Sequence, residues 1–276
     1  MNTTSAPRSI RDALYEVPGP RTHRRMVIGT VVSGAFLAFL VYLVWRQFYV
    51  TGQLAPRYWS FFAQWPTWRF LIDGFRGTIA VALTAGVIAL VLGMLLMLGR
   101  VSELRPLRLV CRVVIDFFRG VPSLLLIYFF FLVVPQYGIK MPSFWMLTLP
   151  VALAAAGVLA EVFRAGVNAV PKGQVEAAYS IGLTRGKVMR KIVLPQAIRF
   201  VIPSLISQLV VVVKDTTVAY VVSYPDLMQN ARVLITNYDA LVSVYFTVAV
   251  IYILINYAIN QASAYVSRRM GVKIIR

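Results

Sequence analysis

The stretch Phe75–Leu98, FRGTIAVALTAGVIALVLGMLLML, carries a single charged residue, Arg76, near its beginning. A run of this length and composition is typical of a helix that crosses a bilayer, which needs about 20 predominantly apolar residues. Inside hydrocarbon, only helices and closed barrels pair all of their backbone N–H and C=O groups. The stretch therefore predicts a membrane-spanning helix.

Five further apolar runs lie on either side of this stretch. Of the 276 residues, 59% are hydrophobic and only 14% are charged, which excludes an ordinary soluble domain that must present polar residues to water. We therefore predict an all-α polytopic membrane protein with six transmembrane helices. The predicted spans are Met26–Trp45, Phe75–Leu98, Phe117–Val134, Phe144–Phe163, Ile198–Val222 and Leu241–Val266.

Basic residues are unevenly distributed between the two sides of the predicted membrane spans. The net charge is +18, and lysine and arginine gather in the N-terminal segment, after the second and fourth spans, and in the tail. Because cytoplasmic loops are enriched in these residues, we place both termini in the cytoplasm and the spans in contact with lipid. Without a basic stripe interleaved with aromatic residues, we expect no binding of nucleic acid.

The spans and their orientation divide the chain into four predicted segments. They are a cytoplasmic segment 1–25, the first helix and outer loop 26–69, a transmembrane domain 70–266 and a cytoplasmic tail 267–276.

The first outer loop is rich in tryptophan and tyrosine. Trp59, Trp65 and Trp68 lie there together with Tyr49 and Tyr58. Such rings favour the headgroup layer of a membrane, because one part of each is apolar and the other polar. The loop is either an interfacial segment or an ordinary connection.

The cytoplasmic connection 164–199 contains signals for short helices. Pro171 suits the first turn of a helix, where its missing N–H would be unpaired in any case. Residues Glu176–Ile181 favour a helix, and Gly182 suits its C-terminal cap. Leu183–Ile192 favour a second short helix. We therefore predict a helix-turn-helix that projects from the membrane, with small residues that allow another protein to approach closely.

This connection resembles the EAA signature of ABC importer permeases. The resemblance is carried by Glu176-Ala177-Ala178, by Gly182 and by Ile192-Val193-Leu194-Pro195, at the spacing of that signature. In that family the loop carries the coupling helix, which docks on a cytoplasmic ATPase. The alternative is a basic loop that lies on phospholipid headgroups. The resemblance implies that the ATPase-coupling residues are Gly173, Glu176, Ala177, Ala178, Gly182, Leu194 and Pro195.

Further matches indicate the branch for polar amino acids such as histidine, glutamine, glutamate and arginine. They are Phe118–Pro122, Glu161–Arg164, Pro171–Gln174 and Lys214–Thr217; the N-terminal stretch Tyr15–Arg21 is similar to the second permease of glutamate importers. The resemblance implies a type I importer core of five helices preceded by one extra helix. It also implies a substrate such as glutamate or glutamine, a homologous second permease in a heterodimer, two ATPase subunits and an extracytoplasmic solute-binding protein.

Several polar residues fall within or beside the predicted spans, where an unpaired charge costs several kcal/mol. A zwitterionic substrate needs an anion for its ammonium group and a cation for its carboxylate. Glu161 or Asp215 suits the first role, and Lys214 suits the second. The alternative is a structural ion pair between Lys214 and one of the acids. The candidate pathway or gating residues are Glu161, Lys214, Asp215, Thr216 and Arg119, and for Arg119 interaction with anionic lipid is an equal alternative.

The sequence lacks the groups that catalysis or metal binding needs. Cys111 and His23 are the only residues of their types, so no metal-ligand spacing exists. No phosphate-binding loop of the Walker type is present, and Gly186-Lys187 is followed by Val188. We therefore predict a transport subunit without a bound metal or cofactor, whose partner ATPase binds ATP and Mg²⁺. The alternatives are a secondary transporter or channel and a membrane-bound enzyme.

Overall fold

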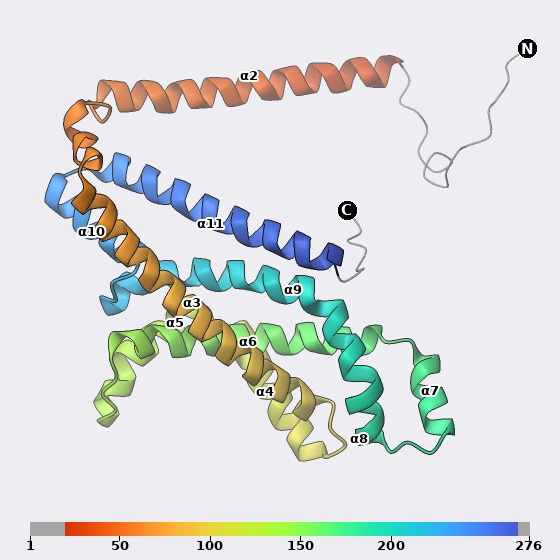
Figure 1. Cartoon of the computed structure of the whole chain (residues 1–276). Helices are drawn as coiled ribbons and strands as arrows, with labels where there is room; N and C mark the ends of the chain where they lie inside the picture. Colours follow the sequence, from red (N-terminus) through yellow and green to blue (C-terminus); the bar gives the residue numbers. More distant parts are fainter. Residues whose placement is uncertain (1–19, 270–276) are drawn as a thin grey trace, which may run out of the picture. The chain divides into compact units, whose positions relative to one another are not determined.

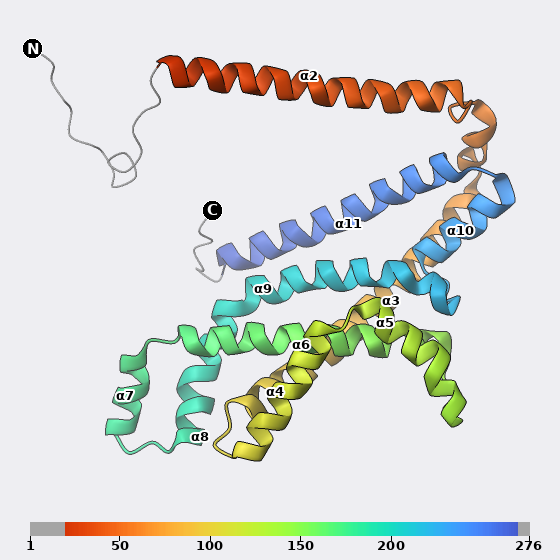
Figure 2. The same cartoon turned by 180° about the vertical axis from the view of Figure 1, so that it is seen from behind.

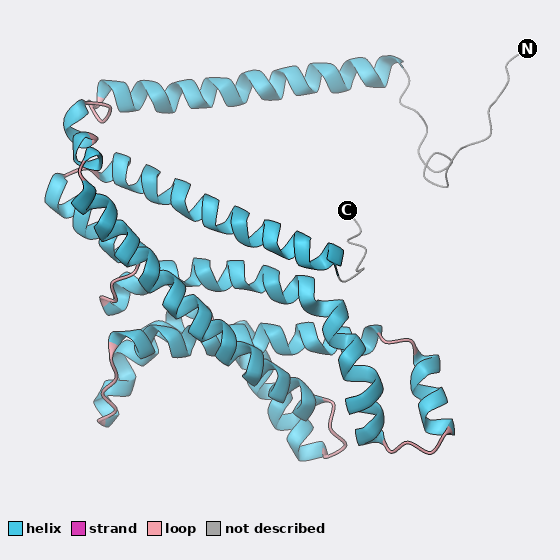
Figure 3. Ribbon diagram, in the orientation of Figure 1, coloured by secondary structure: helices cyan, strands magenta, loops and turns pink. Residues whose placement is uncertain are grey.

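The computed structural model describes residues 20–269, nearly all of them in helices, and this range contains no strand (Figure 3). The all-α prediction is confirmed. Most of the predicted N-terminal segment, with most of the stretch Tyr15–Arg21, lies outside the described residues, as does most of the predicted tail. The chain divides into two compact units, Met1–Pro56 and Arg57–Arg276.

The first unit contains one long helix, α2 (Pro20–Val50). It includes the predicted span Met26–Trp45 and extends beyond it at both ends. No face of α2 is buried by its own unit. A helix that is apolar on all faces suits hydrocarbon, where no face has to be polar. By length and composition, Arg21–Val50 qualifies as a membrane span.

Three long helices form the core of the second unit: α3 (Trp65–Arg100), α6 (Ser143–Ala169) and α9 (Leu194–Asp215). α3 packs against α6, and α6 packs against α9 (Figures 1 and 2). A Cβ atom on Gly93 of α3 would lie 3.0 Å from the carbonyl oxygen of Ala156 in α6. Such close backbone approach supplies the van der Waals contact that holds helices together in lipid.

The predicted third span, Phe117–Val134, is not one straight helix. The structure has α4 (Arg105–Gly120) and then α5 (Ser123–Tyr128), which continues through η3 (Phe129–Val133) and η4 (Val134–Tyr137). The two parts meet at an angle of 99°. Pro122 causes the break, because the residue before a proline avoids helical geometry, and Val121 is extended with ψ 126°. The Phe118–Pro122 motif is therefore the bend itself.

The helix that contains the predicted fifth span begins at Arg185, earlier than Ile198. The helical segment Arg185–Val222 is long and apolar enough to be one span. It comprises α8 (Arg185–Val188), η5 (Met189–Val193), α9 and η6 (Thr216–Val222). The second short helix that we predicted for Leu183–Ile192 is thus the first part of this span. Pro195 does not end the helix; it follows the π-helical turn η5 and lies in the first turn of α9.

The second unit ends with α10 (Leu227–Tyr238) and α11 (Leu241–Arg269). α11 includes the predicted sixth span, whereas α10 was not predicted. Beside them, the aromatic loop forms the short turns η1 (Pro56–Tyr58) and η2 (Ser60–Ala63), and Phe61 stacks on Tyr238 with ring centroids 4.3 Å apart. In the described residues, five helices are long and apolar enough to cross a membrane, and the bent pair makes up to six.

Candidate coupling helix and transport pathway

The predicted coupling segment forms α7 (Lys172–Ser180), which projects beyond the long helices at one end of the second unit (Figure 1). Pro171 is its N-cap. Gly182 follows its C-terminus with φ +79°, a left-handed conformation that favours glycine. The Gly182 N–H donates to the Tyr179 carbonyl at 2.9 Å, and the Leu183 N–H donates to the Ala178 carbonyl at 3.1 Å. These bonds satisfy carbonyls at the helix end.

The predicted coupling residues do not all face outward. Gly173, Glu176, Ala177 and Gly182 are exposed, whereas Ala178 is 4% exposed. We expected Ala178 on the small-residue surface, and its burial corrects that expectation. The cause is the helical period, since Ala178 is the position of α7 that faces the rest of the unit. Of the two remaining coupling residues, Leu194 is half-buried and Pro195 is exposed.

The buried side of α7 belongs to an apolar cluster that ties it to both neighbouring spans. Ala178 packs with Val170, which follows α6, and with residues of the Arg185–Val222 span. Gln196 of α9 donates to the Oε1 atom of Gln174 in α7 at 2.6 Å. The short chain connection joins α7 to α6, and these contacts join it to α9. The members of the cluster are Val170, Ala178, Val188, Val193 and Ala197.

A second contact joins the start of the fifth span to the connection between α3 and α4. The Nη1 atom of Arg185 lies 2.8 Å from the Oε1 atom of Glu103, and its Nη2 atom donates to the Val101 carbonyl at 3.4 Å. Both side chains of this ion pair are more than half exposed. The pair links two chain segments at the end of the unit that carries α7, which we call the coupling end. It lies on solvent-exposed surface.

Glu161 of α6 forms the centre of an ion-pair network. Its Oε2 atom accepts from Arg164 at 2.8 Å, and its Oε1 atom accepts from Arg100 at the end of α3. Arg100 also lies 3.7 Å from Asp116 of α4. The Glu161 side chain is only 16% exposed. The network therefore joins three helices near the end that carries α7.

The structure does not bring the candidate pathway residues together. Glu161 pairs with arginines near the coupling end, so the predicted alternative of an ion pair between Lys214 and Glu161 is wrong. Lys214 is exposed and forms no ion pair within residues 20–269. Asp215 is half-buried and hydrogen-bonds with the Ser123 side chain. Thr216 is fully buried and donates to the Val213 carbonyl at 2.8 Å.

The fifth candidate, Arg119 of α4, lies elsewhere. The stem of its side chain packs close to Gly157 of α6.

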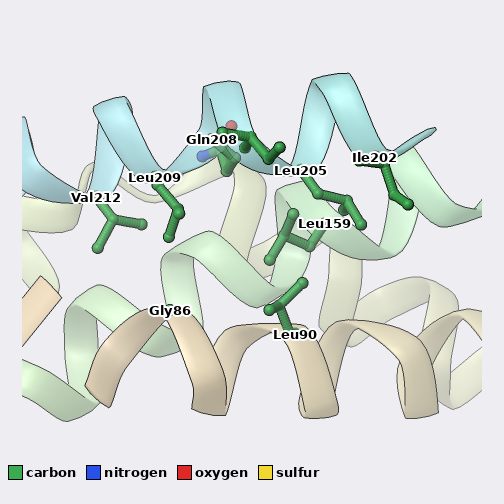
Figure 4. Close-up of a pocket in the computed structure, with 9 residues that line it drawn as sticks. Gly86, Leu90, Leu159, Ile202, Leu205, Gln208, Leu209 and Val212 are labelled. Carbon is green, nitrogen blue, oxygen red and sulfur yellow. The ribbon is translucent and has the colours of Figure 1, made fainter. Parts of the chain in front are cut away.

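An apolar recess lies between α3, α6 and α9 (Figure 4). Gln208 is the one polar side chain in it, among leucine, isoleucine and valine residues. A recess with so few polar groups does not match a zwitterion, whose charges need hydrogen-bonding partners. The lining residues are Gly86, Leu90, Leu159, Ile202, Leu205, Ile206, Gln208, Leu209 and Val212.

The end of the unit opposite α7 contains a buried carboxylate of a different kind. Asp226 is fully buried and caps α10, where its Oδ1 atom accepts from the Gln229 N–H at 2.7 Å. Burial raises the pKa of the Asp226 carboxyl to about 6. The Leu227 N–H donates to Thr78 of α3 at 3.1 Å, and Asn230 donates to the Phe70 carbonyl at 2.7 Å. These bonds fix α10 against α3.

Sequence reasoning missed Arg100 as the partner of Glu161 and missed the polar residues of α10. Asp226, followed three residues later by Gln229, is a recognisable N-cap pattern that would have indicated this helix. The pairing of Arg100 with Glu161 carries no local signal, because the two residues meet only in the folded structure.

The fold defines a polytopic helical membrane protein, with a short helix that projects beyond its long helices (Figure 1). The family of binding-protein-dependent transport system inner membrane components matches residues 89–272, which is more than half of the chain. The chain belongs to this family. It is therefore a permease component and not an enzyme.

Individual relatives cover most of the chain. The glutamate transport system permease protein GluD of Corynebacterium glutamicum is 33% identical over 223 residues, which are 79% of this chain and 82% of that protein. The probable glutamine ABC transporter permease protein GlnP of Bacillus subtilis is 31% identical, over 74% of this chain and 93% of that protein. A crystal structure of an amino acid ABC transporter with histidines superposes with a TM-score of 0.72 at 27% identity, covering 76% of this chain and 98% of its own.

Proposed function

We propose that this chain is the permease subunit of an ATP-driven importer for polar L-amino acids, with glutamate or glutamine as the substrate. The observation that carries the proposal is α7, a short exposed helix held between two spans. The functions of the relatives, which include glutamate, glutamine and arginine transport, support the substrate class.

In this proposal the exposed side of α7 docks on the ATPase. Gly173, Glu176, Ala177 and Gly182 form the docking surface, while Ala178 anchors the helix from behind. Leu194 and Pro195 position the start of α9 behind it. ATP binding closes the ATPase subunits and displaces α7. The apolar cluster and the Gln174–Gln196 hydrogen bond then pass that displacement into α6 and α9.

The Glu161 network suits a gating role in this mechanism. It joins α3, α4 and α6 beside the moving helix, so that a displacement of α6 changes distances between charged groups. Arg119 lies on the same contact between α4 and α6. Lys214, Asp215 and Thr216 lie farther along the chain, where α9 passes into η6, and Lys214 is exposed to receive a carboxylate. We assign these three residues to the substrate pathway.

The proposal includes the partners of such an importer. They are a homologous second permease in a heterodimer, two ATPase subunits that bind ATP and Mg²⁺, and an extracytoplasmic solute-binding protein. The chain lies in a bacterial cell membrane with both termini in the cytoplasm, which the distribution of basic residues supports.

Substitution of Ala177 by tryptophan tests the coupling role. Ala177 is exposed on α7, and unlike Gly182 it has an ordinary helical conformation, so Ala177→Trp adds bulk without backbone strain. The matched control is Gln136→Trp, an exposed position at the opposite end of the unit. We expect Ala177→Trp to lose ATPase co-purification and ATP-dependent uptake of labelled glutamate and glutamine into proteoliposomes, while Gln136→Trp keeps both.

Two results would contradict the proposal. Unchanged uptake and ATPase binding in Ala177→Trp would remove the coupling role of α7. Uptake driven by an ion gradient, without any ATPase, would identify a secondary transporter instead.

A further inference from the structure

Arg232 of α10 lies over the ring of Tyr220, with its guanidinium carbon 4.4 Å from the ring centroid. Both side chains are exposed. Within the described part of the chain, no carboxylate lies within ion-pair distance of Arg232. The guanidinium is thus held by an aromatic ring and has no anionic partner of its own. Such a group is prepared to bind a carboxylate, because a planar stacked guanidinium loses little freedom when its N–H groups bond.

Two recesses meet at this pair of residues. The first has a volume of about 370 Å³, and the second has a volume of about 420 Å³. Each falls within the usual size of a pocket for a small ligand, about 300–1,000 Å³. Besides Arg232 and Tyr220, the first is lined by Gln229, Val233, Thr236 and Asn237, and the second by Thr217, Val218, Met228 and Tyr245. Amide and hydroxyl groups therefore surround the cation.

The backbone that carries Arg232 is firmly anchored. The Asp226 cap and the hydrogen bonds from Leu227 to Thr78 and from Asn230 to Phe70 fix the first part of α10 against α3. The buried residues Ala231 and Leu234 lie on either side of Arg232 in the chain. The position of the guanidinium is therefore set before any ligand binds, which lowers the entropic cost of binding.

The second recess reaches the candidate pathway. Thr217 lines it, and the Thr217 hydroxyl donates to the Lys214 carbonyl at 2.7 Å. The site thus adjoins the Lys214–Thr217 motif, at the end of the unit opposite α7. This placement suits the first contact of a substrate that enters from the side opposite the ATPase.

We propose that Arg232 and Tyr220 form a carboxylate-binding site that receives the amino acid before it enters the pathway. This inference rests on the proposed transport of polar amino acids. The carboxylate has two possible sources, the free amino acid and an acidic side chain of the solute-binding protein. We assign it to the free amino acid, because the two recesses match a small ligand.

Binding is tested on the complete permease–ATPase complex in lipid nanodiscs without the solute-binding protein. ATP-dependent uptake is measured separately in proteoliposomes that are supplied with the solute-binding protein. Binding of ¹⁴C-labelled L-glutamate, L-glutamine and L-arginine is measured separately for the wild type and three variants. Arg232→Gln removes the cation, and Arg232→Lys keeps the charge but loses the planar fork. Arg57→Gln is the matched control, since Arg57 also stacks on a tyrosine, Tyr58, yet lines neither recess. Basal ATPase activity and the thermal unfolding temperature confirm that each variant is folded.

We expect Arg232→Gln to weaken binding of the transported amino acid by about tenfold or more, because the charge-assisted hydrogen bonds to its carboxylate are lost. Arg232→Lys should lie between this variant and the wild type, and Arg57→Gln should match the wild type. The affinity of the complex for the unliganded solute-binding protein is measured in parallel and should not change.

Three results would overturn the inference in different ways. If the wild type shows ATP-dependent uptake but Arg232→Gln binds the amino acid normally, the site is wrong and the transport function stands. If Arg232→Gln weakens only docking of the solute-binding protein, the carboxylate belongs to that protein. If the wild-type complex neither binds nor takes up any of the three amino acids, the proposed function fails first.

Discussion

The two ends of the helical unit hold buried carboxylates in different ways. Near the coupling end, Glu161 accepts hydrogen bonds from Arg100 and Arg164, two cations that belong to different helices. At the opposite end, Asp226 accepts from the backbone N–H of Gln229, and within residues 20–269 no basic side chain lies within ion-pair distance of it. Glu161 thus depends in part on a cation from another helix, Arg100 of α3, whereas Asp226 depends mainly on the backbone of its own helix.

This difference fits the proposed tasks of the two ends. An ion pair between helices changes its energy when the helices shift, because the interaction depends on the distance between the charges. A capping bond within one helix moves with that helix and keeps its energy. The coupling end is thus the part whose electrostatics respond to displacement, whereas α10 forms a fixed frame around Arg232.

Removal of the Glu161 carboxylate should give the largest effect on stability. Glu161→Ala leaves Arg100, whose side chain is 19% exposed, without its closest anionic partner. Because an uncompensated buried charge is costly, we expect a loss of about 3 kcal/mol in the free energy of unfolding. The measurement is denaturation of the purified complex in detergent micelles.

Glu161→Gln serves as the control for this experiment. It retains an oxygen that accepts from an arginine but removes the negative charge, so its loss of stability should be smaller. Equal stability of Glu161→Ala and the wild type would show that the arginines need no partner, and the contrast between the two ends would disappear.

The pH dependence of unfolding tests the other carboxylate. The pKa of Asp226 is raised to about 6 in the folded chain, against about 3.9 in an unfolded chain. Between these values the folded state binds more protons than the unfolded state, so stability falls as pH rises from about 4 to about 6. Above about pH 6 the loss is complete and amounts to about 3 kcal/mol at most.

Asp226→Asn isolates this contribution, because asparagine keeps the capping oxygen and does not titrate. We expect the variant to lose this downward slope of stability between about pH 4 and 6. Unfolding curves of both proteins, recorded across that range in the same detergent, measure the difference. Parallel slopes in the two proteins would exclude Asp226 as the titrating group.

The sequence predicted the spans well because hydrocarbon demands long apolar runs. Phe144–Phe163 and Leu241–Val266 lie within α6 and α11, and the helix around Glu176 ends before Gly182 as the C-cap pattern indicated. Hydropathy does not measure direction, however, and so it could not predict the 99° bend at Pro122. The helix that contains the fifth span also begins before Ile198, because the basic residues there reduce the apolar signal without breaking the helix.

The candidate site was predictable only in part. The coupling segment was found because its residues are consecutive in sequence and match a family signature. Glu161 was found as an intramembrane charge, yet its partner was not, since Arg100 lies 61 positions away. Arg232 and Tyr220 carry no motif, and their contact depends on how α10 folds back beside η6. Interactions between distant segments are set by packing, which one sequence without an alignment does not reveal.

The exposed ion pair between Arg185 and Glu103 should give the smallest effect and sharpen the contrast further. Both side chains are more than half exposed, so water and salt screen their attraction. We expect Glu103→Ala to cost at most about 1 kcal/mol of unfolding free energy, because exposed pairs contribute little. This loss should shrink further at about 1 M salt, where the screening length is about 3 Å. The loss in Glu161→Ala should persist under the same conditions, because the side chains of Glu161 and Arg100 are only 16% and 19% exposed. Denaturation of both variants at low and high salt measures this difference. Equal salt sensitivity would mean that the Glu161 network is as open to solvent as the Arg185–Glu103 pair. The proposed role of that network as a displacement-sensitive gate would then lose its physical basis.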